Sequence, residues 1–203
     1  PVTGCNHGCI YCYARDIGNR FHGGFEPTFY EDRLSAPQNT KLPEKSDGPN
    51  RRVFVCSMAD LFGDWVPQVW IDKVMESVVA APKWTFIFLT KNPKRLVDID
   101  WPDNAWVGTT VDCQERVEAA VEAFKEMSDS ENKPNVSFMS CEPLRSCLSL
   151  GEGLRYFDWV IIGGQSVSSG APAFQPEWGW VEKLHNDARD ANCSIYWKPN
   201  LIV

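Results

Sequence analysis

Six short apolar runs recur along the chain, and they constrain its fold more than any other feature. The runs cover residues 53–56, 85–89, 105–108, 136–139, 159–162 and 194–197. Most are continuous rather than alternating in polarity, which is typical of strands covered on both faces, as in a parallel sheet. The intervals between the runs leave room for helices, as in βα units. The pattern predicts an α/β fold with parallel strands joined by right-handed crossovers.

Apolar stripes at helical spacing fill three of these intervals. The first two consist of Trp70, Val74 and Val78, ended by Pro82, and of Val117, Val121 and Phe124; the third consists of Trp178, Val181, Leu184 and Ala188, with Pro176 near its start. Asp112 and Glu115 have the spacing of a capping box ahead of the second stripe. We also expect a further strand before Cys5, missing or truncated at the start of this chain.

Length and composition favour one domain over residues 1–203. Hydrophobic residues make up 43% and charged residues 23%, which excludes a disordered chain. No apolar run is long enough for a membrane-spanning helix, so no membrane partner is expected. Residues 21–52 carry many Gly and Pro, and we expect an irregular insertion there with one short helix near residues 29–34. The net charge of −7 gives no general attraction to nucleic acid, which is not a favoured partner.

Three of the eight cysteines are packed together, as Cys5, Cys9 and Cys12 in a CxxxCxxC spacing, and the others are scattered singly. This usage predicts a reduced, cytoplasmic protein with a metal site. Zinc normally needs four ligands, and His7 inside the loop would close a strained tetrahedron. Three thiolates instead suit a [4Fe–4S] cluster with one open iron. In that interpretation Gly8 lets the backbone pass close to the cluster, and Tyr11 offers a face to a nucleobase.

The loop resembles the CxxxCxΦC signature of radical S-adenosylmethionine (SAM) enzymes, in which Φ is aromatic. The matching residues are Cys5, Cys9, Tyr11 and Cys12. The resemblance implies a partial (β/α) barrel with the loop after its first strand. It also implies a [4Fe–4S] cluster on the three cysteines, SAM as cofactor, and an electron donor such as flavodoxin or ferredoxin. Tyr13 and Ala14 are similar to the corresponding pair in DNA-photoproduct lyases of that superfamily, so a nucleic-acid substrate is conceivable.

A closer resemblance covers nearly the whole chain. Its segments are residues 1–5, 12–14, 57–62, 89–91, 140–144 and 159–164. They resemble a phage- and bacteria-associated family of radical-SAM-like proteins that is known only as phage proteins of unknown function. This resemblance implies the same cluster and cofactor but no known substrate.

Polar residues follow every apolar run, where the sites of βα barrels lie. Ser57 and Asp60 match the position at which the superfamily holds the methionine amino group, although the usual Gly-Gly-Glu is absent; capping of a helix is the alternative. The cofactor-binding candidates are Tyr11, Ser57, Asp60, Thr109, Thr110, Gly163, Gly164 and Gln165. Thr109 and Thr110 would face the ribose or simply end a strand. The glycine pair would let backbone approach a ligand or simply form a turn.

Three charged residues are the catalytic candidates. Glu142, in Cys-Glu-Pro, is the strongest candidate for a buried functional carboxylate, and its alternative role is a salt bridge to Lys91 or Arg145. Lys91 and Lys198 directly follow apolar runs, where they would contact a substrate or a carboxylate, or else be solvated.

Three functions follow from these features. The leading one is a radical SAM enzyme that reductively cleaves SAM to act on an unknown substrate. The second is a non-enzymatic zinc- or iron–sulfur-binding module that docks a partner. The third is a barrel that binds SAM without turnover.

Overall fold

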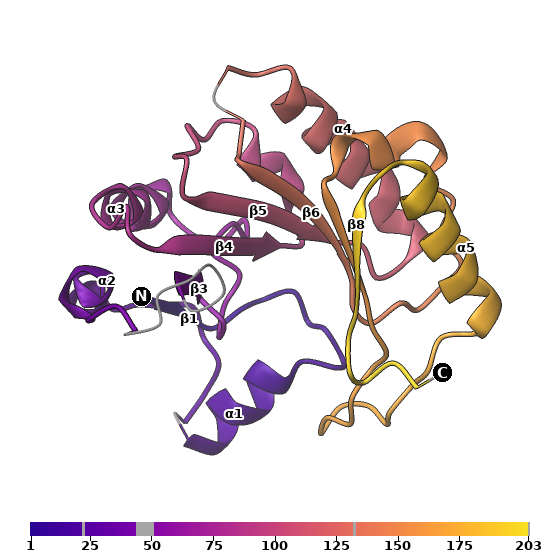
Figure 1. Cartoon of the computed structure of the whole chain (residues 1–203). Helices are drawn as coiled ribbons and strands as arrows, with labels where there is room; N and C mark the ends of the chain where they lie inside the picture. Colours follow the sequence, from indigo (N-terminus) through magenta and orange to yellow (C-terminus); the bar gives the residue numbers. More distant parts are fainter. Residues whose placement is uncertain (22, 44–50, 132, 203) are drawn as a thin grey trace.

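The computed structural model describes residues 1–21, 23–43, 51–131 and 133–202. All six apolar runs form strands of one parallel sheet, in the order β3-β4-β5-β6-β7-β8. The strands are β3 (Arg52–Phe54), β4 (Thr85–Thr90), β5 (Ala105–Thr110), β6 (Val136–Cys141), β7 (Trp159–Ile162) and β8 (Ser194–Trp197). The sheet curls into a half-barrel (Figure 1). The predicted α/β class and parallel sheet are therefore confirmed.

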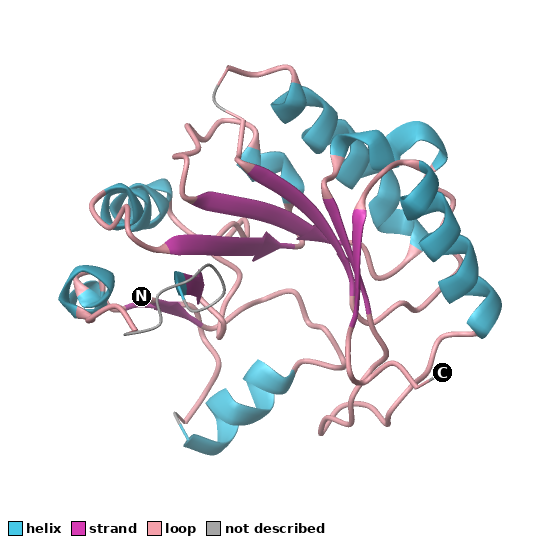
Figure 2. Ribbon diagram, in the orientation of Figure 1, coloured by secondary structure: helices cyan, strands magenta, loops and turns pink. Residues whose placement is uncertain are grey.

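Helices α3 (Gln68–Val79), α4 (Val117–Ser128) and α5 (Trp178–Asp190) lie around the outer side of the sheet (Figures 1 and 2). The short helices η3 (Pro93–Leu96), η4 (Gln114–Arg116) and η5 (Gly151–Tyr156) complete the connections. Side chains alternate along each strand, so one face of β4 places Phe86 and Phe88 in the core under the helices. The other face places Ile87 and Leu89, both half-buried, in the hollow of the half-barrel.

The three predicted stripes all lie on helices, with two corrections. Trp178 is 46% exposed and packs edge-on against Trp197 instead of entering the core. No side chain caps α4, which begins after η4, so the expected capping box of Asp112 and Glu115 does not form. Asp112 points instead toward residues of other elements, described below.

A two-residue strand precedes the cysteine loop (residues 5–12) but lies outside the six-stranded parallel sheet. The expected first strand of that sheet, missing or truncated at the start of this chain, therefore stays a prediction. Strand β1 (Val2–Thr3) pairs antiparallel with β2 (Thr28–Phe29). Gly4 then forms a parallel bridge to Ala59, and its N–H donates to the carbonyl of Met58 at 2.9 Å. The cysteine loop thus starts beside the chain that leaves β3. After the loop comes helix α1 (Tyr13–Phe21).

The described part of the predicted insertion is docked on α3. It contains β2, η1 (Glu31–Arg33) and α2 (Ala36–Asn39). The short helix η1 lies within the predicted residues 29–34, and α2 is a second helical segment that the sequence did not predict. The indole N–H of Trp84 donates to the carbonyl of Pro37 at 2.9 Å, and the hydroxyl of Ser77 donates to the carbonyl of Leu34. His22 and residues 44–50 lie outside the described residues. No helix in the described ranges is long and apolar enough to cross a membrane.

Candidate functional site

The three clustered cysteines line one cavity of about 190 Å³ at the carboxyl ends of β3, β4 and β5. Ser57, Asp60, Lys91 and Thr110 line the same cavity. All three thiols are free and half-buried. Figure 1 shows the chain between β1 and α1 passing beside these strand ends. Residues from four separate segments therefore meet here, as expected for strand-end residues of a parallel sheet.

Backbone geometry shapes the cysteine loop. Gly8 has φ +71°, which L side chains rarely adopt, but a Cβ at that position would meet no atom within 4 Å. The positive φ is a conformational reason for glycine at this position. The expected close approach of its backbone to a cluster stays a prediction. The sulfur of Cys12 accepts the backbone N–H of Arg15 at 3.4 Å, in the first turn of α1. This contact fixes the third cysteine of the loop at the start of α1.

Asp60 fastens the loop to the sheet. One carboxylate oxygen accepts the N–H of Phe62 at 3.0 Å, and the other accepts the N–H of Lys91 at 2.9 Å. That second oxygen also lies 2.7 Å from Nε2 of His7. Asp60 is 6% exposed, so the three contacts satisfy a carboxylate that burial would otherwise destabilise. Asp60 thus makes structural contacts beyond the helix capping that we considered.

Asp112 is the site residue that sequence reasoning missed. Its Oδ2 accepts hydrogen bonds from the ammonium of Lys91, at 2.6 Å, and from the phenol of Tyr11. Its Oδ1 accepts the Nε–H of Arg116 at 2.7 Å. The carboxylate therefore joins the cysteine loop to the ends of β4 and β5. Its position four residues after the predicted strand 105–108, and two after the end of β5, was the available signal, but the capping-box spacing favoured a local role.

Burial and neighbouring charges set the protonation states of Asp112, Tyr11 and Cys5. Burial raises the pKa of Asp112, but Lys91, Tyr11 and Arg116 outweigh it and lower that pKa to about 2. Burial and the hydrogen bond to Asp112 raise the pKa of Tyr11, which keeps the phenol protonated. Burial, reinforced by the negative charge of Asp60 and the neighbouring cysteines, raises the pKa of Cys5 to about 11. A metal at this thiol would therefore displace a proton.

A larger cavity of about 520 Å³ fills the hollow of the half-barrel. It shares Tyr13, Phe54 and Leu89 with the cysteine cavity, so the two are adjacent. Its wall is apolar along the strands, and its rim at the carboxyl ends is polar. The predicted residues Tyr11, Glu142, Gly164, Gln165 and Lys198 line it.

The structure changes the expected partners of the charged candidates. Glu142 lies 3.3 Å from the ammonium of Lys198, not beside Lys91 or Arg145. Its side chain is 29% exposed, so the expected buried carboxylate is instead half-exposed at the cavity rim. Lys91, with a side chain only 10% exposed, pairs with Asp112. Lys91 is therefore a buried ion-pair member, and Lys198 with Glu142 faces the hollow.

Two of the cofactor-binding candidates lie away from both cavities. Thr109 donates its hydroxyl to the carbonyl of Thr90 at 3.0 Å and lines neither cavity. Gly163 packs against the chain itself, because a Cβ there would lie 3.0 Å from Glu142 and 3.1 Å from Lys198. These contacts fit an ordinary strand end for Thr109 and a glycine turn for Gly163 better than they fit ligand contact.

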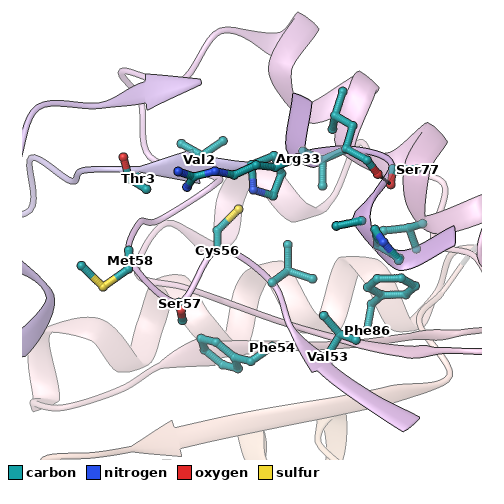
Figure 3. A pocket seen from close by; sticks show the side chains of 17 residues that line it. Val2, Thr3, Arg33, Val53, Phe54, Cys56, Ser57, Met58, Ser77 and Phe86 are labelled. Atoms are coloured by element: carbon teal, nitrogen blue, oxygen red, sulfur yellow. Dashed lines mark hydrogen bonds between the residues drawn. The ribbon is translucent and has the colours of Figure 1, made fainter. Parts of the chain in front are cut away.

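A third cavity, of about 350 Å³, lies between β1, β3, α2 and α3 (Figure 3). Its lining is mostly apolar, and Arg33 is the charged side chain that it contains. Figure 3 shows Cys56 with its sulfur turned toward Val2. With no converging acid–base or ligand groups, this cavity is a weaker candidate than the strand-end pair.

The three cysteines are the residues of this site that could hold a metal or an iron–sulfur cluster. Within the described residues, no set of three or more His, Cys, Asp or Glu side chains is gathered tightly enough to hold a metal ion. A mononuclear ion needs ligands that converge on one point. A cluster needs less convergence, because each thiolate binds a different iron. Three free thiols line one cavity, so these are the residues that could hold a cluster.

Comparison with known proteins places the chain in a family. A family model described as a protein of unknown function (DUF5131) matches residues 1–200. No curated protein and no solved structure matches the chain. With almost its full length matched, the chain belongs to the DUF5131 family of proteins of unknown function.

Proposed function

We propose that this protein is a radical SAM enzyme that holds one [4Fe–4S] cluster on Cys5, Cys9 and Cys12. The observation that carries the proposal is the single cavity that these three free thiols share with polar strand-end residues of a parallel half-barrel. A fourth thiol does not line that cavity, which is consistent with one iron left open to a cofactor. When bound and reduced, the cluster would supply the electron that cleaves SAM.

The protein's own residues would hold and enclose this chemistry. Asp60 and Asp112 fix the loop on two sides, through His7 and Tyr11. Ser57 and Thr110, in the cysteine cavity, are the candidates for polar contact with SAM. Tyr11 and Tyr13 form the wall between the loop and the hollow of the half-barrel. A substrate in the hollow would then lie beside the cofactor.

The direct test is product formation. The protein is purified and reconstituted anaerobically, then incubated with SAM and dithionite, and 5′-deoxyadenosine is measured by chromatography. We expect the product from the wild type and none from Cys9→Ala, which loses a cluster ligand. Cys147→Ala is the matched control, because Cys147 is an exposed thiol that lines neither cavity, and it should keep full activity.

Two other results would redirect the proposal. One zinc per chain without iron–sulfur absorbance would favour a metal-binding docking module. SAM binding to a loaded cluster without 5′-deoxyadenosine would favour a barrel that binds SAM and does not turn it over. Either result contradicts the proposed enzyme.

A further inference from the structure

We infer that the hollow of the half-barrel is a binding site for a zwitterionic amino acid with an aromatic side chain. That the bound amino acid is a substrate rests on the proposed function. Its binding depends only on the cavity. The cavity volume of about 520 Å³ is within the range of small-molecule sites, which runs from roughly 300 to 1,000 Å³.

The wall of the cavity favours a ligand with a flat, apolar side chain. Phe54, Phe138 and Trp159 contribute aromatic rings, and Ile87, Leu89 and Ile161 contribute aliphatic surface. These side chains come from alternate positions on β3, β4, β6 and β7, all on the face away from the helices. Trp159 stacks at a tilt on Phe138, with ring centroids 5.3 Å apart. An aromatic side chain inserted here would bury its faces against preformed rings.

The rim selects opposite charges held close together. Among the described residues that line the cavity, Glu142 and Lys198 are the charged ones, and their charged atoms are 3.3 Å apart. The pair is half-exposed, so a ligand can reach both groups. An ammonium would bind Glu142 and a carboxylate would bind Lys198, as the two ends of an α-amino acid require.

Two residues that line the cavity, Gln165 and Asn200, each carry a buried side-chain acceptor that lacks a hydrogen-bond partner. Gln165 is 5% exposed, and its Nε2 donates to the carbonyl of Pro172 at 2.6 Å. Its Oε1 is buried and has no hydrogen-bond partner in the described structure. The buried Oδ1 of Asn200 is in the same state, while its Nδ2 donates to the carbonyl of Gly164 at 2.7 Å. Buried acceptors left unsatisfied are costly, and an ammonium supplies three donors.

The orientation of the ligand follows from the apolar wall and the charged rim of the cavity. The aromatic body would lie in the hollow, and the amino and carboxyl groups would lie at the carboxyl ends of β6, β7 and β8. That places the charged end of the ligand next to Tyr11 and Tyr13 and the adjoining cysteine cavity. A substrate bound in this way would present its polar end, rather than its ring, to the proposed cofactor.

The test uses a ligand series and calorimetry on the whole chain of residues 1–203. The probes are L-tryptophan, tryptamine, which lacks the carboxylate, indole-3-propionate, which lacks the ammonium, and indole. We expect L-tryptophan to bind most tightly and tryptamine next. Glu142→Gln should weaken L-tryptophan and tryptamine roughly 10-fold or more and leave indole unchanged, because a charge-assisted hydrogen bond is lost. Lys198→Met should weaken L-tryptophan but not tryptamine.

Glu177→Gln is the matched control, since Glu177 is exposed at the start of α5 and outside the cavity, and it should bind like wild type. Circular dichroism checks that each variant folds. Titrations are run both without a cluster and on reconstituted, SAM-loaded protein. The inference is overturned if L-tryptophan, L-tyrosine and L-phenylalanine all fail to bind at millimolar concentration in both forms. Equal binding by wild type and Glu142→Gln also overturns it. Because cluster-free protein is included, these outcomes are independent of whether SAM is cleaved.

Discussion

At the scale of single residues, Asp112 bears the most on the stability of the site. Its side chain is 7% exposed and pairs with Lys91, Arg116 and Tyr11. Lys91 lies 21 positions from Asp112 along the chain, and Tyr11 lies 101 positions from it. A carboxylate this well paired stabilises the fold only while it is ionised.

We predict that Asp112→Asn lowers the free energy of unfolding at pH 7 by about 2 kcal/mol, the value of a pKa lowered from 3.8 to about 2. Since the folded pKa is below the unfolded one, the stabilisation is present above about pH 4 and is lost as the pH falls toward 2. Urea denaturation at pH 7, 4 and 3 measures it. The gap between wild type and variant should narrow at low pH.

Glu122→Gln, at an exposed position of α4, is the control and should change little at any pH. A gap between wild type and Asp112→Asn that stays constant from pH 7 to 3 would show that the carboxylate's charge is not what stabilises this region.

The same residue shows where sequence reasoning stops. Residues at strand ends were identified from the pattern, and the structure places Ser57, Asp60, Lys91 and Thr110 around the cysteines. Their partners were not identified, because an aspartate after a strand can cap a local helix or pair with a distant lysine. The spacing of Asp112 and Glu115 fits both, and tertiary packing selects the pairing with Lys91.

At the scale of elements, the strands were predictable and the N-terminal segment was not. Continuous apolar runs identify β3 to β8, because the outer face lies under the helices and the inner face lines an apolar hollow. The inner face is not fully covered, and Phe54 and Tyr196 are 47% and 46% exposed there. Strand β1 has two residues and is held by β2 and by one bridge from Gly4, so it leaves no periodic signal. The order of the parallel strands follows from βα crossovers, but the anchoring of the cysteine loop depends on this short pairing.

A substitution at Gly4 tests whether this short pairing anchors the cysteine loop. It has φ +82°, and a Cβ there would lie 2.1 Å from the carbonyl oxygen of Glu26. We predict that Gly4→Ala lowers the free energy of unfolding by at least about 2 kcal/mol, because backbone and neighbour must both shift. Equilibrium urea denaturation measures it.

Gly179 is the matched position, since it lies in α5 and a Cβ there would meet no atom within 4 Å. Gly179→Ala should stabilise the protein by about 0.5 to 1 kcal/mol. If Gly4→Ala were as stable as wild type, the described path of the N-terminal segment would be wrong.

At the scale of the whole molecule, the curl of the sheet creates the functional arrangement. A six-stranded half-barrel leaves its inner face open, and the cysteine loop lies across one end of that face (Figure 1). The loop carries the three cysteines that we propose as cluster ligands, and the sheet forms a hollow beside them. The hollow and its paired rim charges are set by curvature and by contacts between distant segments, so no local pattern in the sequence predicts them.

The most direct measurement of the central claim is electron paramagnetic resonance of the reduced, reconstituted protein with and without SAM. The account predicts iron and sulfide in equal amounts, a signal from a reduced [4Fe–4S] cluster, and a change in that signal when SAM binds the open iron. A spectrum that SAM leaves unchanged, or a cluster that survives in Cys9→Ala, would contradict the account.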